Sequence, residues 1–144
     1  MARGQTASRA AISGRVAGIA VAPGGTRIYV AAANGGVWRS DDAGLNWLST
    51  MEGFDVNPGS VASASLVCGA IAIDPAAPDR VYVGTGEGDT DGIFARRIVN
   101  ALPAYRGIGP IRSDDGGATW VQESSSPSLS GFSFFKIAVD RRRR

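Results

Sequence analysis

The sequence contains one eight-residue pattern twice, SDDAGLNW at residues 40–47 and SDDGGATW at residues 113–120, and we call these two segments the boxes. Each box has serine first, aspartate third, glycine fifth and tryptophan last. An aspartate side chain accepts hydrogen bonds from nearby backbone N–H groups, and glycine adopts the positive φ angles of tight turns. The boxes therefore predict two equivalent hairpin turns, each closed by an aromatic residue.

Two segments upstream of each box are repeated as well. IAV at 19–21 corresponds to IAI at 71–73, and RIYV at 27–30 corresponds to RVYV at 80–83. A further copy of the first segment, IAVD, lies at 137–140. Short runs rich in Val, Ile and Tyr, separated by Gly, Pro and Asp, are typical of strands joined by turns. The sequence therefore predicts an all-β chain built from repeats.

A repeat of about four strands that closes on an aromatic residue is typical of a β-propeller blade, which neighbouring blades must cover. We predict a partial β-propeller with about two four-stranded blades and the first strand of a third. A β-sandwich with similar strand spacing is the alternative architecture.

The repeats also predict how the chain is divided. Residues 1–13 form an N-terminal arm, and residues 14–67 form the first blade and a connection. Residues 68–136 form the second blade, and residues 137–144 begin a third repeat that ends in an arginine tail. A closed propeller needs about four blades or more, so the chain is expected to be a fragment of a longer propeller protein, with self-assembly of several copies into a ring as the alternative.

The boxes resemble the Asp-box (BNR) motif, Ser-x-Asp-x-Gly-x-Thr-Trp. The matching residues are Ser40, Asp42, Gly44, Trp47, Ser113, Asp115, Gly117, Thr119 and Trp120, and only Asn46 replaces the motif's threonine. The chain thus resembles the first blades of bacterial glycosyl hydrolase/sialidase-like and sortilin-like propellers. This resemblance implies that the box residues are structural. It also suggests an exported protein, although the N-terminus shows no signal-peptide pattern.

The second blade is expected to carry a long inserted loop at residues 89–107. Ile19 and Trp47 are 28 positions apart, whereas Ile71 and Trp120 are 49 apart. Part of the extra sequence, with Phe94 and Ile98, has helical spacing. Long loops on a rigid β scaffold either bind a ligand or pack over a neighbour, and both interpretations stay open.

Charged and aromatic side chains gather in and beside this loop. The candidate ligand-binding residues are Glu87, Asp89, Asp91, Arg96, Arg97, Tyr105 and Arg106. Arginines and a tyrosine near carboxylates suit a sugar or an anionic ligand, so the predicted partner is a carbohydrate or a protein. The alternating acids also suit Ca²⁺, but residue 98 is Ile where an EF-hand loop needs Glu. No metal site or cofactor is therefore predicted, with calcium as the open alternative.

The chain contains no histidine, which excludes Ser-His-Asp and Cys-His catalysis. Glycoside hydrolysis generally needs two carboxylates at a set separation, and Glu87 is only one candidate. The catalytic residues are therefore unassigned. Two functions stay open: a glycan- or protein-binding scaffold module, and part of a sialidase- or xyloglucanase-like glycoside hydrolase. In the second case the active site would need further blades, so the chain alone is not expected to be active.

The remaining features limit the partners. The net charge of +2 includes the four terminal arginines, so the rest of the chain is slightly acidic and no specific nucleic-acid partner is predicted. No apolar run reaches the roughly 18 residues of a membrane span. Cys68 adjoins an apolar run and is expected to be buried. Two blades leave the faces with Trp47 and Trp120 exposed, which predicts self-association through them.

Overall fold

The computed structural model describes residues 15–52, 54, 67–87, 107–123 and 126–140. The chain forms two four-stranded antiparallel sheets, in which the strands neighbour one another in sequence order. The first sheet contains β1 (Val16–Val21), β2 (Ile28–Ala32), β3 (Val37–Ser40) and β4 (Leu48–Ser49). The second contains β5 (Cys68–Asp74), β6 (Ala77–Thr85), β7 (Pro110–Ser113) and β8 (Val121–Gln122). The predicted all-β fold with two four-stranded blades is confirmed.

The two sheets have the same strand register. Tyr29 of β2 pairs with Arg39 of β3, and Tyr82 of β6 pairs with Arg112 of β7. These pairs follow from the repeat, because RIYV and RVYV form the second strand of each sheet. The four strands of each blade lie within the residue ranges predicted for it, while the exact boundaries stay a prediction.

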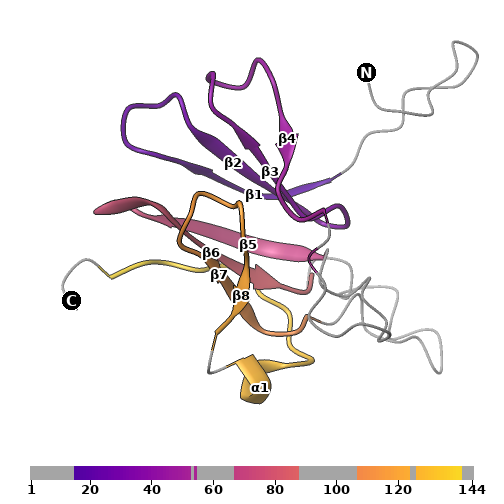
Figure 1. The fold of residues 1–144 in the computed structure, drawn as a ribbon. Coiled ribbons are helices and arrows are strands. Elements are labelled where there is room, and N and C mark those ends of the chain that lie inside the picture. The colour runs from indigo at the N-terminus through magenta and orange to yellow at the C-terminus, as the bar shows by residue number, and fades with distance from the viewer. Residues whose placement is uncertain (1–14, 53, 55–66, 88–106, 124–125, 141–144) are drawn as a thin grey trace, which may run out of the picture.

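The core lies between the two sheets, which face each other in Figure 1. Cross-strand partners share one face of a sheet, so alternate residues of each strand point to the core. Its fully buried members include Tyr29, Val37, Val81 and Ile111. Cys68 lies among them, and burial raises the pKa of its thiol to about 12, so the thiol is protonated at neutral pH.

The two box tryptophans have different surroundings. Trp120 is 8% exposed, and its indole N–H donates to the carbonyl of Thr50 in the first blade at 3.0 Å. Trp47 is 41% exposed. The prediction of exposed tryptophans is therefore right for Trp47 and wrong for Trp120, because the first sheet covers the second tryptophan.

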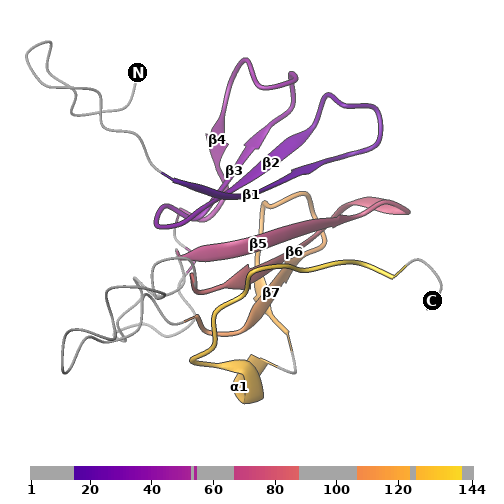
Figure 2. The ribbon, with the colours of Figure 1, turned by 180° about the vertical axis from the view of Figure 1, so that it is seen from behind.

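The segment at 137–140 runs beside the second sheet (Figure 2), on the side opposite the first sheet, but it is not part of a β-strand. The first strand of a blade pairs with the second strand of its own blade, and none of the described strands pairs with this segment. The prediction that this segment is the first strand of a third blade is therefore wrong for the described residues, because no neighbouring strand pairs with it.

A short helix, α1 (Ser126–Leu129), follows β8 and was not predicted. Pro127 lies in its first turn, and Gly131, with a φ of +85°, follows its end. Proline near the start and glycine after the end are typical helix boundaries, so the signal was present. The chain then returns to the second sheet through Phe132 and Phe134.

Candidate functional site

The box residues form two equivalent turns, one between β3 and β4 and one between β7 and β8. In the second turn, Ser113 donates to Asp115 at 2.7 Å and accepts the N–H of Gly117 at 2.7 Å. Asp115 in turn accepts the backbone N–H of Thr119 at 2.8 Å and its hydroxyl at 2.5 Å. The carboxylate is thus directed at its own turn.

The first turn repeats these bonds with one substitution. Ser40 donates to Asp42 at 2.7 Å and accepts the N–H of Gly44 at 2.8 Å. Asp42 accepts the backbone N–H of Asn46 at 2.9 Å and its side-chain amide at 2.7 Å. The amide of Asn46 therefore donates where the hydroxyl of Thr119 donates in the second turn.

These hydrogen bonds make the stability of the fold depend on pH in the acidic range. They lower the pKa of Asp42 and of Asp115 to about 2. An aspartate with a lowered folded-state pKa stabilises the fold above its unfolded value near 4, and this stabilisation is lost as pH falls towards 2. We expect the urea midpoint to fall between about pH 4 and pH 2. In Asp42→Asn/Asp115→Asn the midpoint should be lower at pH 7 but flatter over that range; an equally steep fall in this variant would contradict the prediction.

A different edge of the blades carries Glu87, and we call it the loop edge: the region where β1 begins, β5 begins and β6 ends. The described chain stops at Glu87 and resumes at Gly107 there (Figure 1). The buried hydroxyl of Thr85 donates to the carbonyl of Gly109 at 2.6 Å and accepts the N–H of Ile108 at 2.8 Å. Gly86 donates to the carbonyl of Val67 at 2.8 Å. The two ends of the inserted loop are therefore fixed to each other.

Removal of this hydroxyl should destabilise the blade. Thr85→Val keeps the side-chain shape but leaves a partly buried N–H and a buried carbonyl without their partner, at a cost of about 1–3 kcal/mol. Urea unfolding measures this loss. Thr26→Val, at an exposed threonine, is the matched control and should change the free energy of unfolding by about 0.5 kcal/mol or less. Equal changes in the free energy of unfolding in the two variants would show that the Thr85 hydrogen bonds do not stabilise the blade at the loop edge.

Glu87 is a buried acid at the loop edge. It is 3% exposed and forms an ion pair with Arg15, which directly precedes β1. A buried carboxylate is costly unless it is paired, so the arginine of the first blade holds an acid of the second in place. Sequence reasoning missed Arg15, because the pair joins two blades and no motif links them. The other predicted ligand residues, Asp89, Asp91, Arg96, Arg97, Tyr105 and Arg106, lie outside the described residues.

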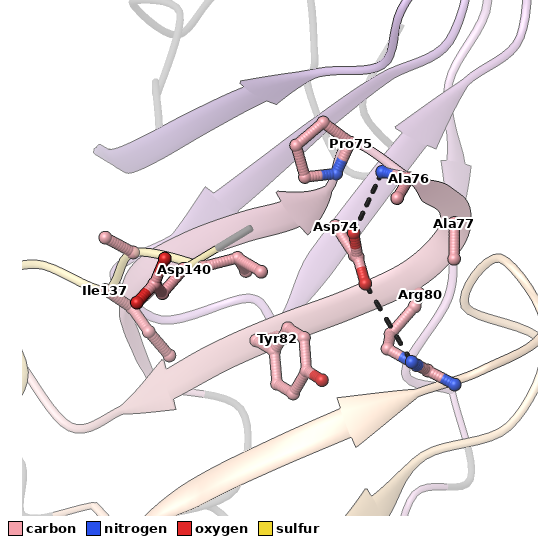
Figure 3. Close-up of a pocket in the computed structure, with 10 residues that line it drawn as sticks. Asp74, Pro75, Ala76, Ala77, Arg80, Tyr82, Ile137 and Asp140 are labelled. Carbon is pink, nitrogen blue, oxygen red and sulfur yellow. Dashed lines mark hydrogen bonds and ion pairs between the residues drawn. The ribbon is translucent and has the colours of Figure 1, made fainter. Parts of the chain in front are cut away.

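A hollow of about 860 Å³ lies on the outer side of the second sheet (Figure 3). Arg80 and Tyr82 of β6 line one side and Ile137–Asp140 the other. Asp74 accepts the N–H of Ala76 at 2.9 Å and lies 3.8 Å from the guanidinium of Arg80. The sequence did not single out this region, because the hollow depends on how residues 137–140 lie against β6.

Within the described ranges, no three acidic, cysteine or histidine side chains are grouped to hold a metal ion. Among the same residues, no helix is long and apolar enough to cross a membrane.

Comparisons with known proteins address the fold. No family model and no curated protein match the chain. Among solved structures, an ancestral GH74 enzyme is similar, with a TM-score of 0.51 and 21% identity over 74% of this chain and 12% of that chain. The GH74 xyloglucanase from Xanthomonas campestris gives 0.46, with 19% identity over 72% and 14% of the two chains. A GH74 enzyme from Niastella koreensis gives 0.46, with 18% identity over 72% and 13%.

The chain therefore spans about an eighth of the first of these structures. GH74 enzymes are β-propellers, and the likeness places the two sheets as neighbouring blades of that architecture. The sialidase-like and sortilin-like resemblances stay predictions. The protein has the fold of a partial β-propeller similar to part of a GH74 enzyme.

Proposed function

We propose that this chain supplies two blades of a propeller whose loop edge binds a glycan or a protein ligand. The buried Glu87 is the observation that carries the proposal. It lies at the root of the long inserted loop, 3% exposed, and is paired with Arg15 of the other blade. The two blades are thus joined at Glu87, the last described residue before the inserted loop.

The chemistry of the loop supports a polar ligand. The 89–107 insert carries Arg96, Arg97, Tyr105 and Arg106. Thr85, which precedes the insert, forms hydrogen bonds with the two residues that directly follow it. Guanidinium groups and a tyrosine provide hydrogen-bond donors and flat surfaces that suit sugars and anions. Binding residues are concentrated on loops that a rigid scaffold positions. The box aspartates are not candidates, because their oxygens accept hydrogen bonds from their own turns.

Titration calorimetry with xyloglucan oligosaccharides and with sialyllactose tests a glycan ligand. We expect saturable binding of one of them, weakened about tenfold or more in Arg96→Ala/Arg97→Ala. The double variant Arg141→Ala/Arg142→Ala removes the same charge from the terminal tail and is the matched control. Absence of binding by the parent chain would overturn the glycan proposal. An equal loss of affinity in both double variants would mean that the ligand is held only by nonspecific attraction to positive charge.

The alternative function is part of a glycoside hydrolase, and the likeness to a GH74 enzyme favours it. Two carboxylates are needed for this reaction, and Glu87 supplies one, so other blades would have to supply the second. A reducing-sugar assay on xyloglucan distinguishes the alternatives. We expect no turnover by this chain alone; turnover that is lost in Glu87→Gln would favour the hydrolase over the binding module.

A further inference from the structure

Three side chains of the first blade hold the second blade. Arg27 donates to the carboxylate of Asp79 at 2.5 Å, and Arg39 donates to the carbonyl of Gly116 at 2.6 Å. The buried hydroxyl of Tyr29 donates to the same Gly116 carbonyl at 3.1 Å. We call the sheet face with this Arg-Tyr-Arg set the donor face. Two of its side chains, Tyr29 and Arg39, bind the box turn of the neighbouring blade.

The second sheet has the same donor face, directed away from the first sheet. Arg80, Tyr82 and Arg112 occupy the equivalent strand positions. Arg80 and Arg112 pair with Asp114 at 2.7 and 2.9 Å, as Arg27 and Arg39 pair with Asp41 at 2.7 and 3.0 Å. The hollow of Figure 3 lies beside this set, where the first interface holds a box turn.

The first sheet has the complementary surface on its outer side, which we call the apolar face. Ile19, Trp38 and Trp47 are 62%, 39% and 41% exposed there. Their equivalents in the second blade, Ile71, Ile111 and Trp120, are 9%, 0% and 8% exposed, because the first blade covers them. The first blade therefore leaves open the surface that the second blade buries.

The first box turn also offers the matching acceptor. Ala43 has a φ of +59° and donates its N–H to the carbonyl of Thr26 at 2.8 Å. Gly116 has a φ of +72° and donates in the same way to Asp79, also at 2.8 Å. The carbonyl of Ala43 is thus presented like the carbonyl that Tyr29 and Arg39 bind.

We propose that a second copy of this chain binds head to tail, with its apolar face on the donor face of the second sheet. Arg112 and Tyr82 donate to the carbonyl of Ala43 in the second copy, and its 41–44 turn lies against the β6 side of the hollow. In the second copy, Thr26 occupies the position that corresponds to Asp79 in the interface between the two blades of one chain. Arg80 therefore gains no carboxylate partner, and the other two donors, Tyr82 and Arg112, fix the register. Such an interface is heterologous and extends to a ring or a filament. It uses surfaces other than the loop edge and is independent of the proposed function.

The incoming copy takes the place of residues 137–140. In the internal interface β5 lies across β1 and β2, and residues 137–140 lie in the corresponding place on the second sheet (Figures 1 and 2). The β1 strand of the second copy would occupy that place. Since the segment belongs to no strand, its displacement breaks no sheet ladder.

Light scattering on a concentration series tests the proposal. We expect the mass to rise with concentration, and the association to weaken about tenfold or more in Arg112→Ala/Tyr82→Phe and in Ile19→Ser/Trp47→Ala. Leu48→Ala is the matched control, because Leu48 is 60% exposed but pairs with Arg39 and so lies on the opposite side of its sheet from the apolar face. Circular dichroism and the melting temperature establish that each variant is folded.

A mixing experiment separates this geometry from nonspecific association. Each double variant retains one intact face, so a 1:1 mixture should form a pair of two chains although each variant alone stays monomeric. A parent chain that is monomeric at every concentration would overturn the proposal. So would donor-face variants that associate as tightly as the parent, or a mixture that does not pair.

Discussion

Trp120→Ala is expected to lower the free energy of unfolding by about 3–5 kcal/mol, the usual cost of truncating a buried aromatic residue. Its ring is 8% exposed between the two blades. The substitution also removes the donor of the 3.0 Å bond to the Thr50 carbonyl. The loss therefore combines a cavity at the interface with an unpaired carbonyl.

Trp47→Ala is the matched control, since Trp47 has the same place in the first box. It is 41% exposed and donates to the carbonyl of Gly44 within its own turn. We expect a cost of about 1 kcal/mol. Urea unfolding, followed by circular dichroism at a concentration where the chain is monomeric, compares the two. Equal losses would mean that the blades do not depend on the Trp120 contact.

Local features were predictable from the sequence because the repeat fixes them. Each box encodes its turn through residues within eight positions, and each Val- and Tyr-rich run encodes a strand. The structure adds that the side-chain amide of Asn46 donates the hydrogen bond that the threonine hydroxyl donates in the second turn. The sequence shows that Asn46 departs from the motif but does not show how it replaces threonine.

Features that depend on contacts between blades could not be predicted. The sequence treats Trp47 and Trp120 alike, and only the order of the blades decides which is covered. The pairing of Arg15 with Glu87 joins residues far apart in the chain, with no repeat partner to reveal it. For the same reason, the placement of residues 137–140 beside β6 and the hollow between them came only from the structure.

The packing of Phe132 and Phe134 on the second sheet predicts a severe effect at Gly69, the second residue of β5. A Cβ there would overlap the backbone carbonyl oxygens of Phe134 and Gly86. Neither oxygen can rotate away as a side chain does, and the Gly86 backbone is also bonded to Val67 at 2.8 Å. The strand or the returning segment must therefore move as a whole.

Gly69→Ala is accordingly expected to cost about 3 kcal/mol, at the upper end of the range for overpacking. Gly35→Ala is the control, because its Cβ would lie 3.5 Å from Ala32 and its φ is outside the left-handed region. Alanine there restricts the unfolded chain and should leave stability unchanged or raise it by up to about 1 kcal/mol.

Hydrogen exchange tells where Gly69→Ala acts. The Gly107 N–H donates to the carbonyl of Phe132 at 3.1 Å, so displacement of the returning segment should speed its exchange while the first sheet keeps its protection. Faster exchange throughout both sheets would instead mean that β5 itself has shifted and that the blades separate together. Unchanged stability and exchange would contradict the close packing of this segment on β5, because an alanine could then be accommodated without any movement of the backbone.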